Sequence, residues 1–344
     1  MKNIFLYFFI IILCSCSINA REKDKKKPEW LENPEKVYSP QMYLTAIGEG
    51  DTRKDAKSMA AANLAKIFKM EVKASENTLQ RYEELTKDNK TKNEDFTQIE
   101  KNVNIQSNQV LMNVKYADTY TDNLGRVYAL AYINRLKTAQ IYEQKINNNA
   151  AKIDYFLELA KKRDEIKYKY AAYSAAHMIA DRNETLIEQL RVIKSEFIDI
   201  LEISYNQTEI AKQKANFASK ITVSISLSND YENKISNILE EVITDFGFSI
   251  NEESLYELTG DLNFEKIDLR RDKRFKFVRF HLNLKLTEKD NNHTIITLNE
   301  KGREGHVSVD EAKERGIRKL EKELENSFKK KIYAYFDGLV APKK

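Results

Sequence analysis

The spacing of apolar residues changes twice along this chain, and each change marks a different kind of segment. Residues 42–48 (MYLTAIG) alternate with a period of two, which predicts a strand after which Gly48 and Gly50 turn the chain. A capping box at Thr52 and Asp55 then predicts the start of a helix. Its apolar side chains recur at helical spacing and predict one buried face, formed by Ala56, Met59, Ala60, Leu64, Ile67 and Phe68.

Two further alternating runs, within residues 109–135, predict a β-hairpin on which this helix packs. They flank the tetrapeptide Asp122-Asn123-Leu124-Gly125, which is typical of a tight turn. The polar stretch between Val72 and Gln109 has few side chains to bury, so it predicts a second, mobile helical excursion. Together these segments predict a small α+β domain over residues 38–137.

Residues 138–218 lose the strand period and predict long helices without glycine. The pattern breaks near Asp181, and Asn183 is a suitable cap for a second helix, so we expect a helical hairpin. A single tetratricopeptide-like pair is the alternative, but such repeats need about three copies to bury their faces. A helical layer that bridges two domains is therefore the preferred interpretation.

Residues 219–344 return to the strand period and predict a second α+β domain. The expected order is a strand at 220–228, a helix at 231–248, three strands between 256 and 302, and a helix from Ser308 to about Phe336. We expect turns at 271–273 and 290–292. The predicted fold class is α+β, with two helix-on-antiparallel-sheet domains joined by a helical hairpin layer.

The two domains share a start signal for a helix. Ser308 and Glu311 repeat the capping box of the first domain, and Leu64 and Leu320 stand eight positions after the alanine that follows each box. Duplication of one helix-on-sheet unit and convergence both account for this repeat.

The N-terminus predicts a targeting leader. The apolar run from Ile4 to Leu13 is ten residues long, whereas a spanning helix needs about 20, and Lys2 supplies the positive charge of a signal peptide. Leu13-Cys14-Ser15-Cys16 resembles a bacterial lipobox. We therefore expect a leader over residues 1–15 and lipidation of Cys16 with diacylglyceryl and palmitate-type chains. Cys14 is the weaker choice for lipidation, because the bulky Leu13 precedes it where a small residue is expected, and a plain signal peptide cut near Ala20 is the other alternative.

Two or three acyl chains hold a protein durably on a membrane, whereas one holds it only marginally. Ser17 stands where lipoproteins retained at the inner membrane carry Asp, so the resemblance favours the outer membrane. Residues 16–37 then form a basic tether. Pro28, Pro34 and the following Pro40 keep the chain extended, and Trp30 pins it to the first domain.

The charge distribution argues against a nucleic-acid partner. The formal charge is +4, and residues 1–27 hold all of it, with six basic and two acidic residues, so the remainder is neutral. A nucleic-acid-binding fold needs a concentrated basic footprint. The only two cysteines, Cys14 and Cys16, lie at the leader, so no disulfide is expected in the folded domains.

No motif for catalysis, a metal or a cofactor is present in the sequence. The four histidines are scattered without ligand spacing, and neither a nucleotide loop nor a nucleophile elbow occurs. Tyrosines are dense in the middle helices, where the rings serve either the core or a partner surface equally well. The candidates for a partner surface are Tyr168, Tyr170 and Tyr173.

A family resemblance follows from these residues. Pro28 and Trp30, Gly48 at the strand end, the helix residues Ala56, Ala60 and Leu64, and the lipobox at Cys16 together resemble the LPP20 family of bacterial lipoproteins. The resemblance covers about residues 28–137. It implies a membrane-anchored α+β domain, an outer-membrane location and no known catalysis; the domain also occurs in flagellar accessory proteins.

The preferred hypothesis is a non-enzymatic docking or structural lipoprotein at the periplasmic face of the outer membrane, serving envelope or flagellar assembly. Its partners are then the membrane, through the acyl chains, and an unidentified envelope protein; the oligomeric state stays open. A lipid or glycan carrier is the first alternative, with a pocket lined by Phe264, Phe275, Phe277 and Phe280. A hydrolase is the second.

Overall fold

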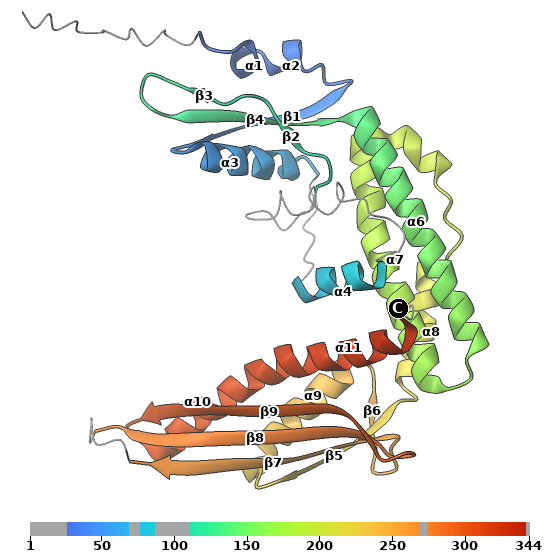
Figure 1. Cartoon of the computed structure of the whole chain (residues 1–344), viewed down its shortest axis with the longest axis vertical. Coiled ribbons are helices and arrows are strands. Elements are labelled where there is room, and N and C mark those ends of the chain that lie inside the picture. Colours follow the sequence, from blue (N-terminus) through green and yellow to red (C-terminus); the bar gives the residue numbers. More distant parts are fainter. Residues whose placement is uncertain (1–25, 69–75, 87–110, 269–273, 342–344) are drawn as a thin grey trace, which may run out of the picture.

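The computed structural model describes residues 26–68, 76–86, 111–268 and 274–341. Cys16 and the predicted leader lie outside these residues. The chain is α+β, as predicted, and has the shape of a C (Figure 1). An α+β domain forms each arm of the C, and a layer of long helices, here called the spine, connects them.

The first arm contains an antiparallel sheet with one helix on its inner face. The hairpin prediction is confirmed: Asp122 and Gly125 lie in the turn, and Gly125 has a φ of 83°. Strand β4 pairs with the three others, and its pairing with β1 runs from Tyr43↔Asn134 to Gly50↔Val127. The elements are β1 (Tyr43–Gly50), α3 (Arg53–Lys66), β2 (Lys115–Tyr116), β3 (Tyr120–Thr121) and β4 (Val127–Asn134).

Gly48 and Gly50 do not turn the chain, because both lie within β1. Their role is to let α3 approach the sheet closely. A Cβ atom on Gly48 would lie 2.1 Å from the backbone nitrogen of Ala60 and 2.5 Å from the carbonyl oxygen of Ala56. Only glycine fits where two backbones come so near.

The buried face of α3 is turned about the helix axis relative to the prediction. Ala56, Ala60 and Leu64 are buried as expected, whereas Met59 is 44% exposed and Ile67 is 38% exposed. Phe68, just after the helix, is also buried as predicted, and the face includes two further buried residues, Ala61 and Ala65. The small side chains of α3 allow a broad, flat contact with the sheet, which the helical spacing of apolar residues does not reveal.

The prolines of the tether do not keep it extended. Two short helical turns, α1 (Glu29–Glu32) and α2 (Pro34–Val37), occupy this segment, and Pro34 is the first residue of α2. Proline suits that position because its missing N–H would have no partner in a first helical turn. Trp30 is buried, and α1 packs against β4.

The spine consists of two long helices that pack along their length, α6 (Arg135–Lys162) and α7 (Ile166–Lys194). A helical turn, η1 (Ser195–Ile200), and α8 (Gln207–Ala218) follow. The break predicted near Asp181 is wrong: the chain reverses at residues 163–165, and Asn183 lies buried in the middle of α7. Its polar side chain is satisfied by neighbouring helices instead of capping a helix end.

The second arm has a five-stranded sheet of order β6-β5-β7-β8-β9. This sheet is mixed, not antiparallel as predicted, because β5 pairs in parallel with β6 and β7. Helix α9 crosses over between these strands, and a crossover helix produces parallel pairing. The elements are β5 (Thr222–Ser228), α9 (Lys234–Asp245), β6 (Ser249–Ile250), β7 (Tyr256–Ile267), β8 (Lys276–Glu288) and β9 (His293–His306).

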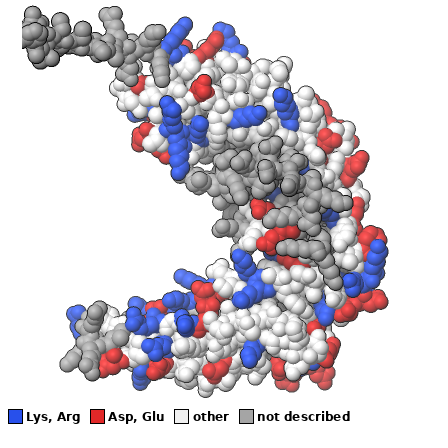
Figure 2. Space-filling view, in the orientation of Figure 1, with Lys and Arg blue, Asp and Glu red and all other residues white. Residues whose placement is uncertain are grey.

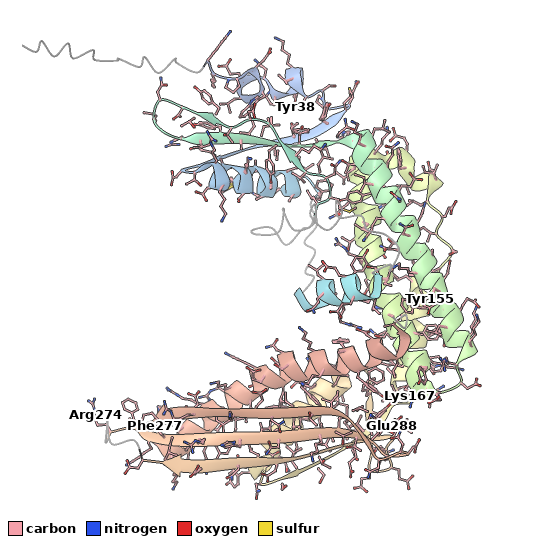
Figure 3. All side chains as sticks on the ribbon, viewed as in Figure 1. Tyr38, Tyr155, Lys167, Arg274, Phe277 and Glu288 are labelled. Atoms are coloured by element: carbon pink, nitrogen blue, oxygen red, sulfur yellow. The ribbon has the colours of Figure 1, made fainter. Side chains whose placement is uncertain are left out.

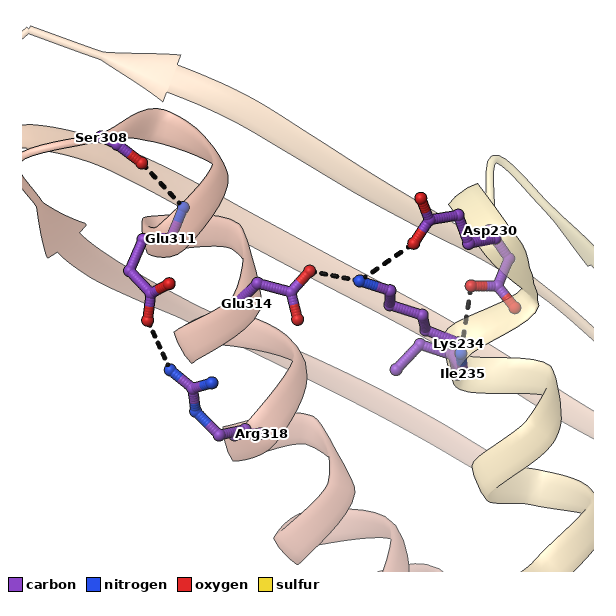
Figure 4. Close-up of polar contacts among 8 residues, drawn as sticks. Asp230, Lys234, Ile235, Ser308, Glu311, Glu314 and Arg318 are labelled. Carbon is purple, nitrogen blue, oxygen red and sulfur yellow. Dashed lines mark hydrogen bonds and ion pairs between the residues drawn. The ribbon is translucent and has the colours of Figure 1, made fainter.

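The final helix covers this sheet and is longer than predicted. It comprises α10 (Val309–Glu323), a π-helical turn (Leu324–Phe328) and α11 (Lys329–Val340). Ser308 caps it, with its hydroxyl 3.1 Å from the Glu311 nitrogen, as predicted. Lys234 on α9 pairs with Glu314 and so connects the two helices of the layer (Figure 4).

The repeated helix start has the same packing consequence in both arms. Ala56, Ala60 and Leu64 line one face of α3, and Ala312, Gly316 and Leu320 line the matching face of α10; all six are buried. The first helix follows the first strand of its sheet and the second follows the last. Duplication and convergence therefore both remain open as explanations.

Two hydrophobic cores hold the C together, and the spine contributes to each. The first arm packs on the upper part of the spine around Tyr142, Ile146 and Leu190. The second arm packs on the lower part around Ile153, Tyr170 and Ala176. Because both arms share α6 and α7, these helices fix the separation of the arms.

Candidate docking surfaces

The helix layers of both arms face the space inside the C. Helix α3 covers the face of its sheet that looks toward the second arm, and α10 with α11 covers the face that looks back (Figure 1). The space-filling view shows a hollow between the arms, with Lys and Arg visible over α3 on one side and over α10 and α11 on the other (Figure 2). We call these two helix faces the inner faces.

Exposed charges on the inner faces are mostly basic, although the folded part of the chain has no net charge. On α3 the exposed charged residues are Asp55 and four cations, Arg53, Lys54, Lys57 and Lys66. From α10 to α11 they include four acids, Asp310, Glu311, Glu314 and Glu325, and six cations, Arg315, Arg318, Lys319, Lys322, Lys330 and Lys331. The fold thus concentrates basic charge that the sequence spreads out.

Helix α4 (Glu76–Thr86) connects the spine to the second arm. The Arg81 guanidinium binds Asp337 of α11 through two hydrogen bonds of 2.7 and 2.9 Å and lies 3.8 Å from the centre of the Tyr333 ring. Lys330 of α11 donates to Gln80 at 3.1 Å. The prediction that this polar segment has little to bury is wrong for α4, because Tyr82 and Leu85 are buried. The remainder of that segment lies outside the described residues.

A chain of buried polar side chains continues from α4 into the spine. Tyr82 donates to Asn149 of α6 at 2.9 Å, and the Asn149 amide donates to Asn183 of α7 at 3.0 Å. Asn183 donates in turn to the Ile146 carbonyl and the Tyr205 hydroxyl, both at 3.1 Å. Such a network fixes how the helices align, because a shift along their axes would leave buried polar groups unpaired.

Lys167 and Glu288 form the second polar joint between spine and sheet, with Nζ 2.6 Å from Oε1 (Figure 3). Burial opposes ionisation of Glu288, but hydrogen bonds from Lys167 and Asn291 outweigh it and lower the pKa of the carboxyl. Burial likewise opposes the charge on Lys167, but hydrogen bonds to Glu288 and Glu165 outweigh it and raise the pKa of the ammonium. No spacing in the sequence indicates this pair.

The three tyrosines predicted as a partner surface do not lie on one surface. Tyr170 is 1% exposed and packs between Phe248 and Phe336, so it belongs to the core. Tyr168 lies beneath the cations of Arg163 and Lys167, and Tyr173 stacks on Phe217 at 5.5 Å between ring centres. Only Tyr168 and Tyr173 are partly exposed, and their contact with a partner stays a prediction.

A hollow of about 350 Å³ between α7, α8 and the end of α9 has three titratable residues in its lining, His177, Lys214 and Asp245. His177 in its wall is held by Asp181 at 3.1 Å, and burial lowers the pKa of the neighbouring Lys214 ammonium. The hydroxyl of Thr244 donates to the Glu240 carbonyl at 2.8 Å and is therefore not activated by a base. The lining has no arrangement for nucleophilic catalysis.

The four phenylalanines of the carrier hypothesis do not line one pocket. Phe280 is 1% exposed, and its ring and that of Phe264 pack against Gly316 of α10. Phe275 and Phe277 lie instead at the far end of the β7–β8 hairpin, beside a separate hollow of about 610 Å³. Phe280 belongs to the core and Phe264 packs against it, whereas Phe275 and Phe277 lie at the hollow.

The described ranges contain neither a membrane-spanning helix nor a cluster of metal ligands. No helix there is both long and apolar enough to cross a bilayer. The same ranges contain no group of three or more His, Cys, Asp or Glu side chains placed to hold a metal ion.

A family model for the LPP20 lipoproteins matches residues 28–134, which confirms the resemblance seen in the N-terminal part and supports a bacterial lipoprotein. The match covers the first arm and not the second. No curated protein matches the chain.

Several solved structures resemble parts of the chain distantly. A secreted protein from Helicobacter pylori is 13% identical, with a TM-score of 0.37, over 88% of this chain and 99% of its own. A minor lipoprotein from Acinetobacter baumannii is 14% identical, with a TM-score of 0.26, over 33% and 92%. The rare lipoprotein B from Shewanella oneidensis is 8% identical, with a TM-score of 0.24, over 33% and 92%.

Proposed function

We propose that this lipoprotein is a non-enzymatic docking component, held on the periplasmic face of the outer membrane by acyl chains on Cys16, and that it grips an envelope protein between its two arms. Envelope or flagellar assembly is the process it serves. The observation that carries the proposal is the arrangement of the inner faces: α3 and α10–α11 look toward one another across the hollow, and both are basic.

The joints support a gripping role because they resist opening of the C. The arms share α6 and α7 in their cores, and Arg81, Asn149 and Lys167 connect α4, the spine and the second arm by buried or half-buried polar contacts. A preorganised surface loses less conformational freedom on binding than a flexible one. The basic inner faces favour a partner with an acidic surface, since complementary charge increases the rate of association.

Photocrosslinking in cells tests the site of docking. A crosslinking amino acid replaces Lys57 on α3 or Lys322 on α10, and in matched controls it replaces Lys36 on α2 or Lys285 on the outer face of β8; all four lysines are exposed. We expect one partner to crosslink from both inner positions and from neither control. Equal crosslinking from inner and outer positions would contradict the gripping model.

The anchor is tested separately. Replacement of Cys16 by Ala should release the chain from the outer-membrane fraction, because no acyl chain is then attached. Mass spectrometry of the mature N-terminal peptide should find diacylglyceryl and amide-linked acyl groups on Cys16. An unmodified peptide that begins after Ala20 would overturn the anchor while leaving the inner faces untouched.

A further inference from the structure

The end of the β7–β8 hairpin exposes apolar side chains, in contrast to the rest of β8. Along β8, buried apolar residues alternate with exposed polar ones such as Arg279 and Lys285. At the hairpin end the pattern changes: Phe275 is 41% exposed, and Val307, where β9 ends, is 62% exposed. Neither side chain is needed to complete the core on the other side of the sheet.

A hollow of about 610 Å³ with an amphipathic lining lies beside Phe275. Ile267, Phe275, Phe277 and Val309 contribute apolar surface, Lys266 and Lys276 contribute cations, and Asp268 is the one acid. The Phe277 ring lies over Gly305, where a Cβ atom would be 2.5 Å from the ring. The Arg303 guanidinium is 6.0 Å from the centre of the same ring.

We propose that this hairpin end is a second membrane contact, in which Phe275 and Val307 enter the lipid interface and the neighbouring cations meet anionic headgroups. Aromatic and aliphatic groups ringed by lysine and arginine are the pattern of interfacial attachment. Lysine stems lie along apolar surface while their ammonium groups reach the headgroups. The lysines Lys266 and Lys276 outnumber Asp268 in this lining, so the balance of charge suits an anionic lipid surface.

The position of the hairpin end supports a lipid surface as its occupant. Phe277 lies at the end of the second arm that is farthest from Lys167, Glu288 and the spine (Figure 3). The first described residues, before α1, also lie on the side of the C opposite the spine (Figure 1). The inference rests on the proposed anchor, because a membrane that holds the N-terminus would face the side of the C on which the hairpin ends.

A depth measurement on the lipidated chain tests the contact. In that chain Cys16 carries lipid and Cys14 leaves with the leader, so Phe275→Cys introduces a single free thiol for an environment-sensitive fluorophore. Tyr155→Cys is the matched control, because Tyr155 is an aromatic residue of α6 with 49% exposure that lies on the spine. Both labelled chains are placed on phosphatidylglycerol-containing vesicles with nitroxide-labelled acyl chains, and flotation first verifies that each chain is attached.

We expect the nitroxide lipids to quench the fluorophore at position 275 at least about threefold more strongly than at position 155, because only the former lies at the depth of the acyl chains. A label introduced by Val307→Cys should be quenched like the label at position 275. Val307→Cys takes the place of Phe275→Cys if Phe275→Cys does not fold. Equal quenching at the hairpin end and on the spine would overturn the proposal and leave this end free for a protein partner. Failure of flotation, in contrast, concerns the anchor alone.

Discussion

Arg81 and Asp337 are 256 positions apart in the chain, yet they form a two-point ion pair between α4 and α11 in which both side chains are largely buried. The pair joins α4, which lies between α3 and β2 of the first arm in sequence, to the last helix of the second arm. It lies on a continuous path of contacts through Tyr82, Asn149 and Asn183 into the spine. The geometry of the C therefore depends on a few polar joints as well as on its cores.

Replacement of Arg81 by Ala should lower the free energy of unfolding by about 3 kcal/mol, because Asp337 is then left with a buried, unpaired charge. Denaturant unfolding followed by circular dichroism measures this effect, and hydrogen exchange should locate the loosening in α4 and α11. Lys161→Ala is the control, since Lys161 pairs with Glu158 on an exposed helix face and should produce no measurable loss. Equal effects of the two variants would contradict the joint.

Replacement of Asn183 by Ala should destabilise the spine by about 2 kcal/mol, because the Asn149 amide then loses its acceptor in a buried site. The double variant with Asn149→Ala should cost less than the sum of the two single changes, since the two side chains satisfy one another. Unfolding midpoints of the four chains measure the coupling. Strict additivity would show that the network does not act as a unit.

Replacement of Gly48 by Ala should destabilise the first arm by about 3 kcal/mol, because the added Cβ would overlap backbone atoms of α3 that cannot move aside. Gly338→Ala is a control of the same size in α11. A Cβ atom there meets nothing within 4 Å, and alanine favours helix over glycine by about 0.5–1 kcal/mol. Thermal unfolding should thus move in opposite directions for the two variants; a harmless Gly48→Ala would refute the close contact.

The Lys167–Glu288 pair predicts a loss of stability in acid. The pKa of Glu288 is lower in the folded chain than the ordinary glutamate value of about 4.3, so its contribution is complete above that value and is lost as the pH falls through the folded pKa. The raised pKa of Lys167 has the opposite sign, so that its contribution is complete below about pH 10.4 and is lost only as the pH rises through the folded pKa.

Glu288→Gln should therefore lower the unfolding midpoint at neutral pH and make it less sensitive to pH below about 4.3. The measurement is a series of thermal unfolding curves from neutral to acid pH on both chains. Glu257→Gln, at an acid on the same sheet, is the control and should keep the native profile. A Glu288→Gln profile parallel to the native one throughout would contradict the assignment.

Short-range signals in the sequence were enough to predict most helices and strands of this fold. The capping boxes at Thr52 and Ser308 start helices where predicted, and the turn at Asp122 joins two pairing strands, because these signals act over three or four residues. The residues Trp30, Gly48 and Ala56 together indicated the LPP20 resemblance that the family match confirms. Leader and lipidation of Cys16 also rest on the sequence, outside the described residues.

Tertiary structure decided what distant segments do to one another. Asn183 has the local character of a helix cap but is buried in the middle of α7, because Asn149 and Tyr205 satisfy it there. Tyr170 belongs to the core because it packs against Phe248 and Phe336. The periodicity of its own helix does not indicate these contacts. The inner faces and the hairpin end likewise exist only in the folded chain, since burial and charge there are properties of surfaces that segments far apart in sequence form together.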